Sequence, residues 1–241
     1  MKKQPHLLVG KGEVNEIALL PGDPSRVEFF ARLCDDFEII SENREYKIYN
    51  AEYEGKNITI CSTGIGCPSA AIAIEELYRV GVKKMIRVGT AGAIQRGINI
   101  GEFVIATGAA KEEGTTKRYE PETYPAVAHH EIVSALIESS ERQGVEFHVG
   151  AVVTDDAYYA ETQEYIEKWK NAKLLAVEME TSVVLALSRR LGIQAGAILT
   201  IDGNLIEGSK KSETEEKEFS SETLDRIGKM GQIALDAGIS I

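Results

Sequence analysis

The chain contains few cysteines and no long apolar segment. Its 241 residues include 3 cysteines, whose spacing matches neither a Cys-x-x-Cys motif nor a zinc site. We therefore expect Cys34, Cys61 and Cys67 to be buried free thiols of a cytoplasmic protein. No apolar run approaches the ~20 residues that cross a bilayer, and only Leu7 to Val9 follow the first lysines as a continuous apolar stretch. We predict neither a membrane span nor a secretory signal.

Basic residues are also in deficit. The chain has 27 Lys and Arg against 38 Asp and Glu, which gives a net charge of −11. Nucleic acids and anionic membranes attract basic surfaces, so we expect neither as a partner. With 43% hydrophobic and 27% charged residues, the composition is that of a folded globular protein rather than a disordered one.

Short apolar runs alternate with helical patterns, which predicts a single α/β domain over residues 1–241. Several runs are almost continuously apolar, as in strands buried on both faces of a sheet. The charge-dense segment 208–222 predicts a solvated loop or a flap over a nearby site. The predicted strands are 17–20, 56–62, 84–89, 103–107, 149–154, 174–179 and 195–201, and the predicted helices are 68–81, 130–144, 181–192 and a last one from about Ser221.

Two of the predicted strands lead into glycine-containing turns. Pro21-Gly-Asp-Pro-Ser-Arg26 places a turn, a helix start and an arginine together, an arrangement that can bind an anion. Thr63-Gly-Ile-Gly-Cys-Pro-Ser69 resembles a dinucleotide-binding turn, but Ser69 stands in the third glycine position and no acidic residue follows about 20 positions on. This second turn instead predicts that the backbone approaches a small ligand.

A third strand carries a charge inside its apolar run, at Arg87-Val-Gly-Thr-Ala-Gly-Ala93. A buried cation without a partner destabilises a protein by several kcal/mol. Two interpretations account for Arg87. It forms a structural ion pair with a glutamate, or it holds an oxyanion together with the Thr90 hydroxyl. The second is favoured, because a guanidinium binds phosphate through two parallel hydrogen bonds.

Five motifs between about His6 and Asn204 resemble those of the hexameric nucleoside phosphorylase family. In order they are Pro-Gly-Asp-Pro-x-Arg, Asn-Arg-Glu-Tyr, Thr-Gly-Ile-Gly-x-Pro-Ser, Ile-Arg-Val-Gly-Thr-x-Gly and Val-Glu-Met-Glu. The family includes purine nucleoside, uridine and some methylthioadenosine phosphorylases. The resemblance implies a three-layer α/β/α fold with a central mixed sheet. It also implies phosphorolysis of a ribonucleoside to free base and ribose-1-phosphate, with no metal or organic cofactor.

The resemblance also assigns residues to inorganic phosphate, the second substrate. In this sequence they are Gly22, Arg26, Arg87 and Thr90, with Arg44 contributed by a neighbouring subunit. A shared site of this kind implies a homo-oligomer, a hexamer built as a trimer of dimers. The net negative charge does not oppose this assignment, because the local field decides anion binding.

The same motif match assigns the nucleoside contacts. Glu180 and Met179 would bind the ribose, His6 would reach its 5′ end across a dimer interface, and Tyr158 and Glu178 would contact the base. From the residues alone, Glu178 and Glu180 alternate along a predicted strand and so face the same side, or else they form an acidic cap on the following helix.

Asp202 is the candidate general acid, with Arg87 as the second catalytic residue. It follows the predicted strand 195–201, and Gly203 allows a sharp turn that would aim its carboxyl group at purine N7. Uridine-specific family members carry Gln-x-Arg after the aromatic segment, whereas Gln163 here has no such Arg. We therefore predict a preference for purine nucleosides. The alternatives are a uridine phosphorylase, a nucleosidase that uses water, and a non-catalytic nucleoside-binding module.

Overall fold

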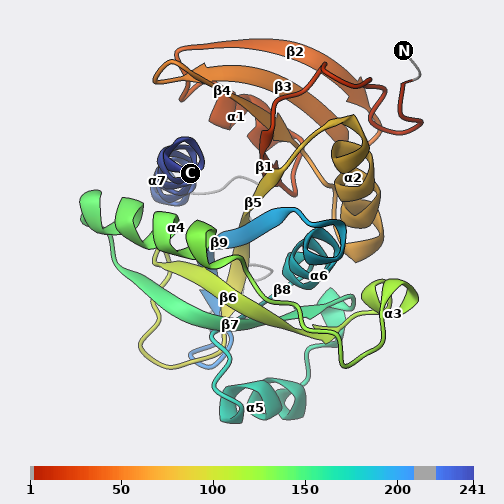
Figure 1. Cartoon of the computed structure of the whole chain (residues 1–241). Helices are drawn as coiled ribbons and strands as arrows, with labels where there is room; N and C mark the ends of the chain where they lie inside the picture. The colour runs from red at the N-terminus through yellow and green to blue at the C-terminus, as the bar shows by residue number, and fades with distance from the viewer. Residues whose placement is uncertain (1–2, 209–220) are drawn as a thin grey trace.

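The computed structural model describes residues 3–208 and 221–241, and within them one mixed sheet runs through the molecule (Figure 1). The strand order is β2-β3-β4-β1-β5-β8-β7-β6-β9. The strands are β1 Ile17–Pro21, β2 Asp36–Asn43, β3 Tyr46–Tyr53, β4 Lys56–Cys61, β5 Lys84–Ala93, β6 Phe103–Glu112, β7 Phe147–Asp155, β8 Ala176–Glu178 and β9 Gln194–Asn204. The helices are α1 Ser25–Ala31, α2 Cys67–Val80, α3 Thr116–Tyr119, α4 His130–Arg142, η1 Tyr158–Ala160, α5 Gln163–Asn171, α6 Thr181–Leu191 and α7 Ser221–Ser240.

The central strands β4, β1, β5 and β9 are parallel and are covered on both faces. A hydrophobic core lies on each face of the sheet. Successive side chains of a strand pack into opposite cores, because they point to opposite faces. Leu20 and Met85 pack with α2 and α6, whereas Leu19 and Ile86 pack with α1, α4 and α7. Figure 1 shows these two groups of helices on either side of the sheet. The predicted three-layer fold is confirmed.

The sheet also curls back on itself. β5 pairs with β9 as well as with β1 and β8, so the pairings β5-β8-β7-β6-β9 close into a ring. Small side chains such as Ala91, Ala106 and Ala197 pack together in this part of the core, as a narrow ring of strands requires. The closure brings the end of β8, which bears Glu178, beside the carboxyl ends of β5 and β9.

Most predicted strands are present, and the differences have local causes. The segment 174–179 forms only the three-residue β8, because the chain turns into α6 directly after Glu178. The hairpin β2–β3 was not predicted, since the mostly exposed β2 (Asp36-Phe-Glu-Ile-Ile-Ser-Glu-Asn43) lacks a buried apolar run. Segment 208–222 lies largely outside the described residues. In the part of the chain that the structure describes, no helix combines the length and apolarity needed to span a membrane.

Candidate active site

The predicted phosphate and catalytic residues meet at one edge of the sheet. Gly22 follows β1, Thr90 lies near the end of β5, and Asp202 lies near the end of β9. Because these strands are parallel, their carboxyl ends share an edge, which is where α/β proteins bind ligands. Four charged side chains lie within electrostatic reach of Arg26: Asp23, Asp202, Arg87 and Glu180.

Arg87 occupies the centre of the cluster and is 3% exposed. Its Nε donates to Oε2 of Glu178 at 2.9 Å, and its Nη2 lies 2.5 Å from Oε2 of Glu180. Burial lowers the pKa of Arg87, but the carboxylates of Glu180 and Glu178 outweigh that effect and hold the pKa above its ordinary value. A Cβ atom at Gly89 would meet Nη2 of Arg87 at 2.8 Å, so a larger residue there would displace the guanidinium.

One nitrogen of the Arg87 guanidinium has no hydrogen-bond partner among the described residues. This atom, Nη1, is buried. An orphaned buried N–H is costly unless a ligand or water completes it. Both interpretations of Arg87 therefore have structural support, because two of its nitrogens form the ion pair and the third remains for an oxyanion.

Glu178 is fully occupied by protein donors. Its carboxylate accepts from the Thr154 hydroxyl at 2.5 Å and from the backbone N–H groups of Glu180 and Thr181 at 2.8–2.9 Å, besides Arg87. It thereby satisfies amides at the start of α6, which is the acidic-cap alternative. Its role in base binding remains a prediction. Glu178 and Glu180 both face Arg87, as expected, but they are not alternate residues of one strand, because β8 ends at Glu178 and Glu180 is already the N-cap position of α6.

Glu180 is held from two sides. Its Oε1 accepts from the backbone N–H of Gly66 at 2.5 Å, and its Oε2 faces Arg87. Burial raises the pKa of Glu180 above its ordinary value, opposed by Arg87 and assisted by the neighbouring charge of Glu178. Gly66 has φ of +88°, a conformation that glycine adopts without strain. The glycine-rich turn before α2 thus places its backbone against a carboxylate of the site.

Arg26 is the second buried cation at this edge and is 9% exposed. Burial lowers its pKa below the ordinary value, and the charge of Arg87 lowers it too, while Asp23, Asp202 and Glu180 act in the opposite direction. Two guanidinium groups that repel each other in a buried site are stabilised when an anion binds between them. The arrangement is therefore suited to phosphate.

Asp202 occupies a β-bulge. In the β5–β9 ladder Ala91 pairs with Ile201 and Gly92 pairs with Gly203, so Asp202 is the extra residue of β9. Bulges next to active sites redirect a side chain. Burial raises the pKa of Tyr158, and the charge of Asp202 raises it further, so the two side chains are within electrostatic reach of each other. The sequence anticipated a turn at Gly203 but not a bulge.

The remaining predicted residues, Tyr158, Arg44, Met179 and His6, lie outside the Arg87 cluster, and we call them the rim. Tyr158 is 44% exposed and makes an edge-on contact with Tyr159. Arg44 is exposed at the β2–β3 turn with φ of +56°. Met179 is half-buried directly before Glu180. His6 does not contact the Arg87 cluster; its imidazole Nδ1 lies 2.7 Å from Glu76 Oε1 in α2.

Three contributors to the site were not predicted from the sequence: Gly66, Gly89 and Thr154. The glycine-rich turn signalled a backbone approach at Gly66. Gly89 could have been predicted, because it lies two residues beyond Arg87 and alternate residues of a strand share a face. Thr154 gave none, because a threonine at the end of an apolar strand is common.

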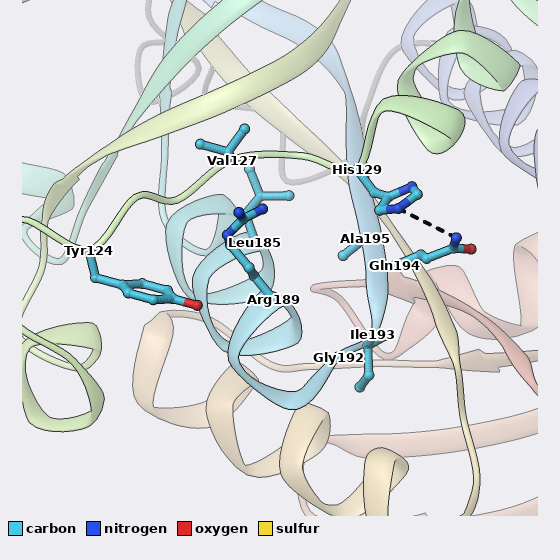
Figure 2. A pocket seen from close by; sticks show the side chains of 9 residues that line it. All are labelled: Tyr124, Val127, His129, Leu185, Arg189, Gly192, Ile193, Gln194 and Ala195. Atoms are coloured by element: carbon cyan, nitrogen blue, oxygen red, sulfur yellow. Dashed lines mark hydrogen bonds between the residues drawn. The ribbon is translucent and has the colours of Figure 1, made fainter.

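A separate cavity of about 490 Å³ lies away from these residues (Figure 2). It is lined by Gln194 and Ala195 at the start of β9, whereas Asp202 is near the end of the same strand. At ~3.3 Å per residue the two places are more than 20 Å apart along β9. Its His129 ring and the Gln194 amide lie 3.5 Å apart, and no charged cluster like that of Arg87 lines it. We place the candidate site at the carboxyl edge, because the buried charges are there.

The described residues, 3–208 and 221–241, contain no group of three or more His, Cys, Asp or Glu side chains that could hold a metal ion. The prediction that no metal or organic cofactor takes part stays a prediction.

Comparison with known proteins agrees with this geometry. The family model described as the Phosphorylase superfamily matches residues 16–236. The chain belongs to the phosphorylase superfamily. It is 54% identical over 237 residues to the guanosine phosphorylase of Halorubrum lacusprofundi, covering 98% of each chain. The family predicted from the five motifs is confirmed.

Solved structures of two other phosphorylases share the fold. The purine nucleoside phosphorylase of Toxoplasma gondii, in complex with immucillin-H, superposes with a TM-score of 0.92 at 31% identity, over 100% of this chain and 96% of that one. The uridine phosphorylase of Vibrio fischeri superposes with a TM-score of 0.91 at 34% identity, over 100% and 99% of the two chains. This phosphorylase therefore resembles both purine and pyrimidine enzymes over its whole length.

Proposed function

We propose that this phosphorylase cleaves the N-glycosidic bond of purine ribonucleosides, guanosine foremost, with inorganic phosphate as the second substrate. One observation carries the proposal. Two buried arginines, Arg26 and Arg87, lie together at the ligand-binding edge, and Nη1 of Arg87 has no partner among the described residues. The identity of 54% with a guanosine phosphorylase supports the choice of base.

The proposed reaction breaks the bond between C1′ and the base nitrogen and forms a bond between C1′ and a phosphate oxygen. Arg26, Arg87, Gly22 and Thr90 hold the phosphate on one face of the sugar. As the glycosidic bond lengthens, the sugar gains positive charge, which the phosphate dianion stabilises. The leaving base gains electron density and takes up a proton.

Two acidic residues complete the proposed mechanism. The Glu180 carboxylate accepts hydrogen bonds from the two ribose hydroxyls, as a carboxylate can from a vicinal diol. Asp202 delivers a proton to N7 of the purine, which is general-acid catalysis of base departure. Its place in the β-bulge, near Arg26 and Tyr158, supports a position between phosphate and base.

Uridine phosphorolysis is the second candidate, because uridine phosphorylases are among the relatives, one at 37% identity over 236 residues. The residue two positions after Gln163 is Tyr165. Burial raises the pKa of the Tyr165 hydroxyl, and the charge of Asp155 raises it further, so this side chain is neutral. A neutral tyrosine cannot replace the cation that binds a pyrimidine carbonyl in uridine-specific members. This difference favours purines.

A substrate panel tests the function. Guanosine, inosine, adenosine, methylthioadenosine and uridine are each incubated with and without phosphate, and the products are identified. We expect ribose-1-phosphate only with phosphate, and fastest from guanosine or inosine. Free ribose in the absence of phosphate would indicate a nucleosidase, and no product from any nucleoside would indicate a binding module. A preference for uridine would overturn the purine assignment.

We further propose that the enzyme is a cytoplasmic homo-oligomer, a hexamer built as a trimer of dimers. Its support is that Arg44 and His6 do not contact the Arg87 cluster of their own chain, although the family resemblance assigns both to the site. Light scattering measures the assembly directly. A fully active monomer would contradict the shared site.

A further inference from the structure

The N-terminal arm, residues 3–10, is fastened to α2 by one buried carboxylate. Glu76 is 3% exposed. Its oxygens accept from the backbone N–H of His6 at 3.1 Å and of Leu7 at 2.8 Å, and Oε1 lies 2.7 Å from Nδ1 of the His6 ring. A glutamate buried in the middle of a helix is unusual unless paired, and here its partners all belong to the arm.

We propose that Glu76 is the positioning residue of His6, which it orients toward the active site of a neighbouring subunit. The inference rests on the proposed function, and it adds to it the residue that fixes both the ring and the place of the arm. Leu7 is 0% exposed and packs in the core beside α2, so the backbone on which His6 stands is also fixed.

The hydrogen bond to Glu76 decides which ring nitrogen is available. A carboxylate that accepts from Nδ1–H sets the tautomer of a histidine and leaves Nε2 to act. Nε2 then accepts a hydrogen bond from the 5′-hydroxyl of the nucleoside when the ring is neutral, or donates one when it is protonated. Without Glu76 the ring is free to take the other tautomer and other rotamers.

The position of Glu76 on α2 indicates a site in another subunit. Gly66, at the N-terminus of the same helix, donates to Glu180 of the chain's own site. From Gly66 to Glu76 the helix rises by about 15 Å at ~1.5 Å per residue. The residue that anchors His6 is therefore well separated along α2 from the turn that contacts Glu180, which supports a ribose in a neighbouring subunit as the partner of the His6 imidazole.

The arm is also tied to the hairpin that bears Arg44. The Asn43 side-chain amide donates to the carbonyl of His6 at 2.7 Å, and the Tyr46 ring makes an edge-on contact with the His6 ring at 6.5 Å. Asn43 and Tyr46 flank the two-residue turn that contains Arg44. The two residues that the family resemblance assigns to a partner's site are therefore carried by one connected unit.

Glu76→Gln tests the positioning role, with Glu75→Gln as the matched control. Glu75 is the adjacent residue of α2 and its carboxylate contacts the Arg79 guanidinium at the surface. We expect Glu76→Gln to lower kcat/KM for guanosine by about 10- to 100-fold, the scale for a misplaced contact group. The control leaves kcat/KM within about twofold.

Two readouts separate positioning from a general structural defect. The loss caused by Glu76→Gln is absent when the substrate is 5′-deoxyguanosine, which lacks the hydroxyl that His6 contacts. It is also absent in a His6→Ala background, because residues that act as a unit are not additive. The proposal is overturned if Glu76→Gln, at an unchanged melting temperature, still lowers kcat/KM by the full factor with 5′-deoxyguanosine or in the His6→Ala background.

A mixing experiment tests the action on a neighbouring subunit. Glu76→Gln and Arg87→Ala chains are dissociated, mixed in equal amounts and reassembled. A site is intact when its Arg87 comes from a Glu76→Gln chain and its arm comes from an Arg87→Ala chain. Random pairing gives this combination in about a quarter of the sites. Recovery of about a quarter of the wild-type activity supports the proposal, and none overturns it. Asp202→Asn replaces Arg87→Ala should the latter not assemble.

The failure of the proposed function is recognised separately. A wild-type protein that forms no ribose-1-phosphate from any nucleoside refutes the function, whereas an active wild type with an equally active Glu76→Gln variant refutes only the role of Glu76.

Discussion

The catalytic end of the molecule has an inner part and a rim that differ in kind. In the inner part Arg87, Glu178 and Glu180 are each no more than 5% exposed, and each charge meets another within the same chain. At the rim Arg44 and Tyr158 are exposed, the first on a strained hairpin turn. The inner charges are paired within one chain, whereas Arg44 and Tyr158 of the rim are open to solvent.

This difference separates two kinds of substitution. The inner charges hold β5, β8 and the start of α6 together, so removing one weakens both folding and catalysis. The exposed rim residues Arg44 and Tyr158 contribute little to the packing of the chain, so we expect the removal of either to weaken catalysis alone.

The largest effect is expected at Asp202, which lies between the two parts in the β-bulge. Asp202→Asn keeps the shape of the side chain and removes its proton. General-acid catalysis contributes about 10²- to 10⁴-fold, and we expect a loss of that size in guanosine phosphorolysis. Steady-state rates with guanosine and uridine check it. Any uridine activity is nearly unchanged, because a pyrimidine offers no N7; an equal loss on both bases would identify a structural role.

Arg87→Ala is expected to reduce cleavage by about 30- to 1000-fold, the scale of losing one charged contact in the transition state. It also leaves two carboxylates without their cation, which destabilises the fold by about 3–5 kcal/mol. Denaturant unfolding measures the second effect and initial rates the first. Arg142→Ala, an exposed arginine at the end of α4, is the control and changes neither. If the rate falls and the free energy of unfolding does not change, Arg87 contributes to catalysis but not to folding, as expected of a rim residue.

Arg87 and the two glutamates of the inner part could be singled out from the sequence because their signals are local. Few physical explanations account for a charge within an apolar strand, as at Arg87, or for a pair of glutamates before a helix. Both explanations offered for Arg87 have support in the structure. The carboxyl ends of the strands then follow from the α/β pattern. The two glutamates face the same side, as expected, although through the start of α6 rather than by alternation along a strand, since β8 has only three residues.

The rim and the barrel-like closure of the sheet could not be predicted in the same way. The second pairing of β5, with β9, joins segments that lie far apart in the chain and leaves no periodic pattern. The bulge at Asp202 arises from that pairing. Nothing in the sequence distinguishes Glu76 from other acidic residues of a helix, because its partner His6 is 70 residues away.

Arg44→Gly distinguishes the rim most directly. Arg44 has φ of +56°, a left-handed conformation that disfavours non-glycine residues by about 1 kcal/mol or more. Glycine relieves that strain, so we expect an equal or higher melting temperature. The rate nevertheless falls about 10- to 100-fold with loss of a charged hydrogen bond to phosphate. Thermal unfolding and rates at several phosphate concentrations check both. An active variant would show that Arg44 has no part in phosphate binding.

The smallest effect is expected from the titration of Glu180. Burial raises its pKa in the folded protein above the ordinary value of 4.5, although Arg87 opposes this. A group with a raised folded-state pKa contributes its full stability below the ordinary pKa. That stability is lost as pH rises toward the folded pKa, because the unfolded chain releases its proton first. Wild type therefore loses stability relative to Glu180→Gln across this window. Urea unfolding of both proteins between about pH 4 and 7 measures the difference. If the difference does not change with pH, the Arg87 charge fully compensates the burial of Glu180, and the inner part carries no net electrostatic penalty.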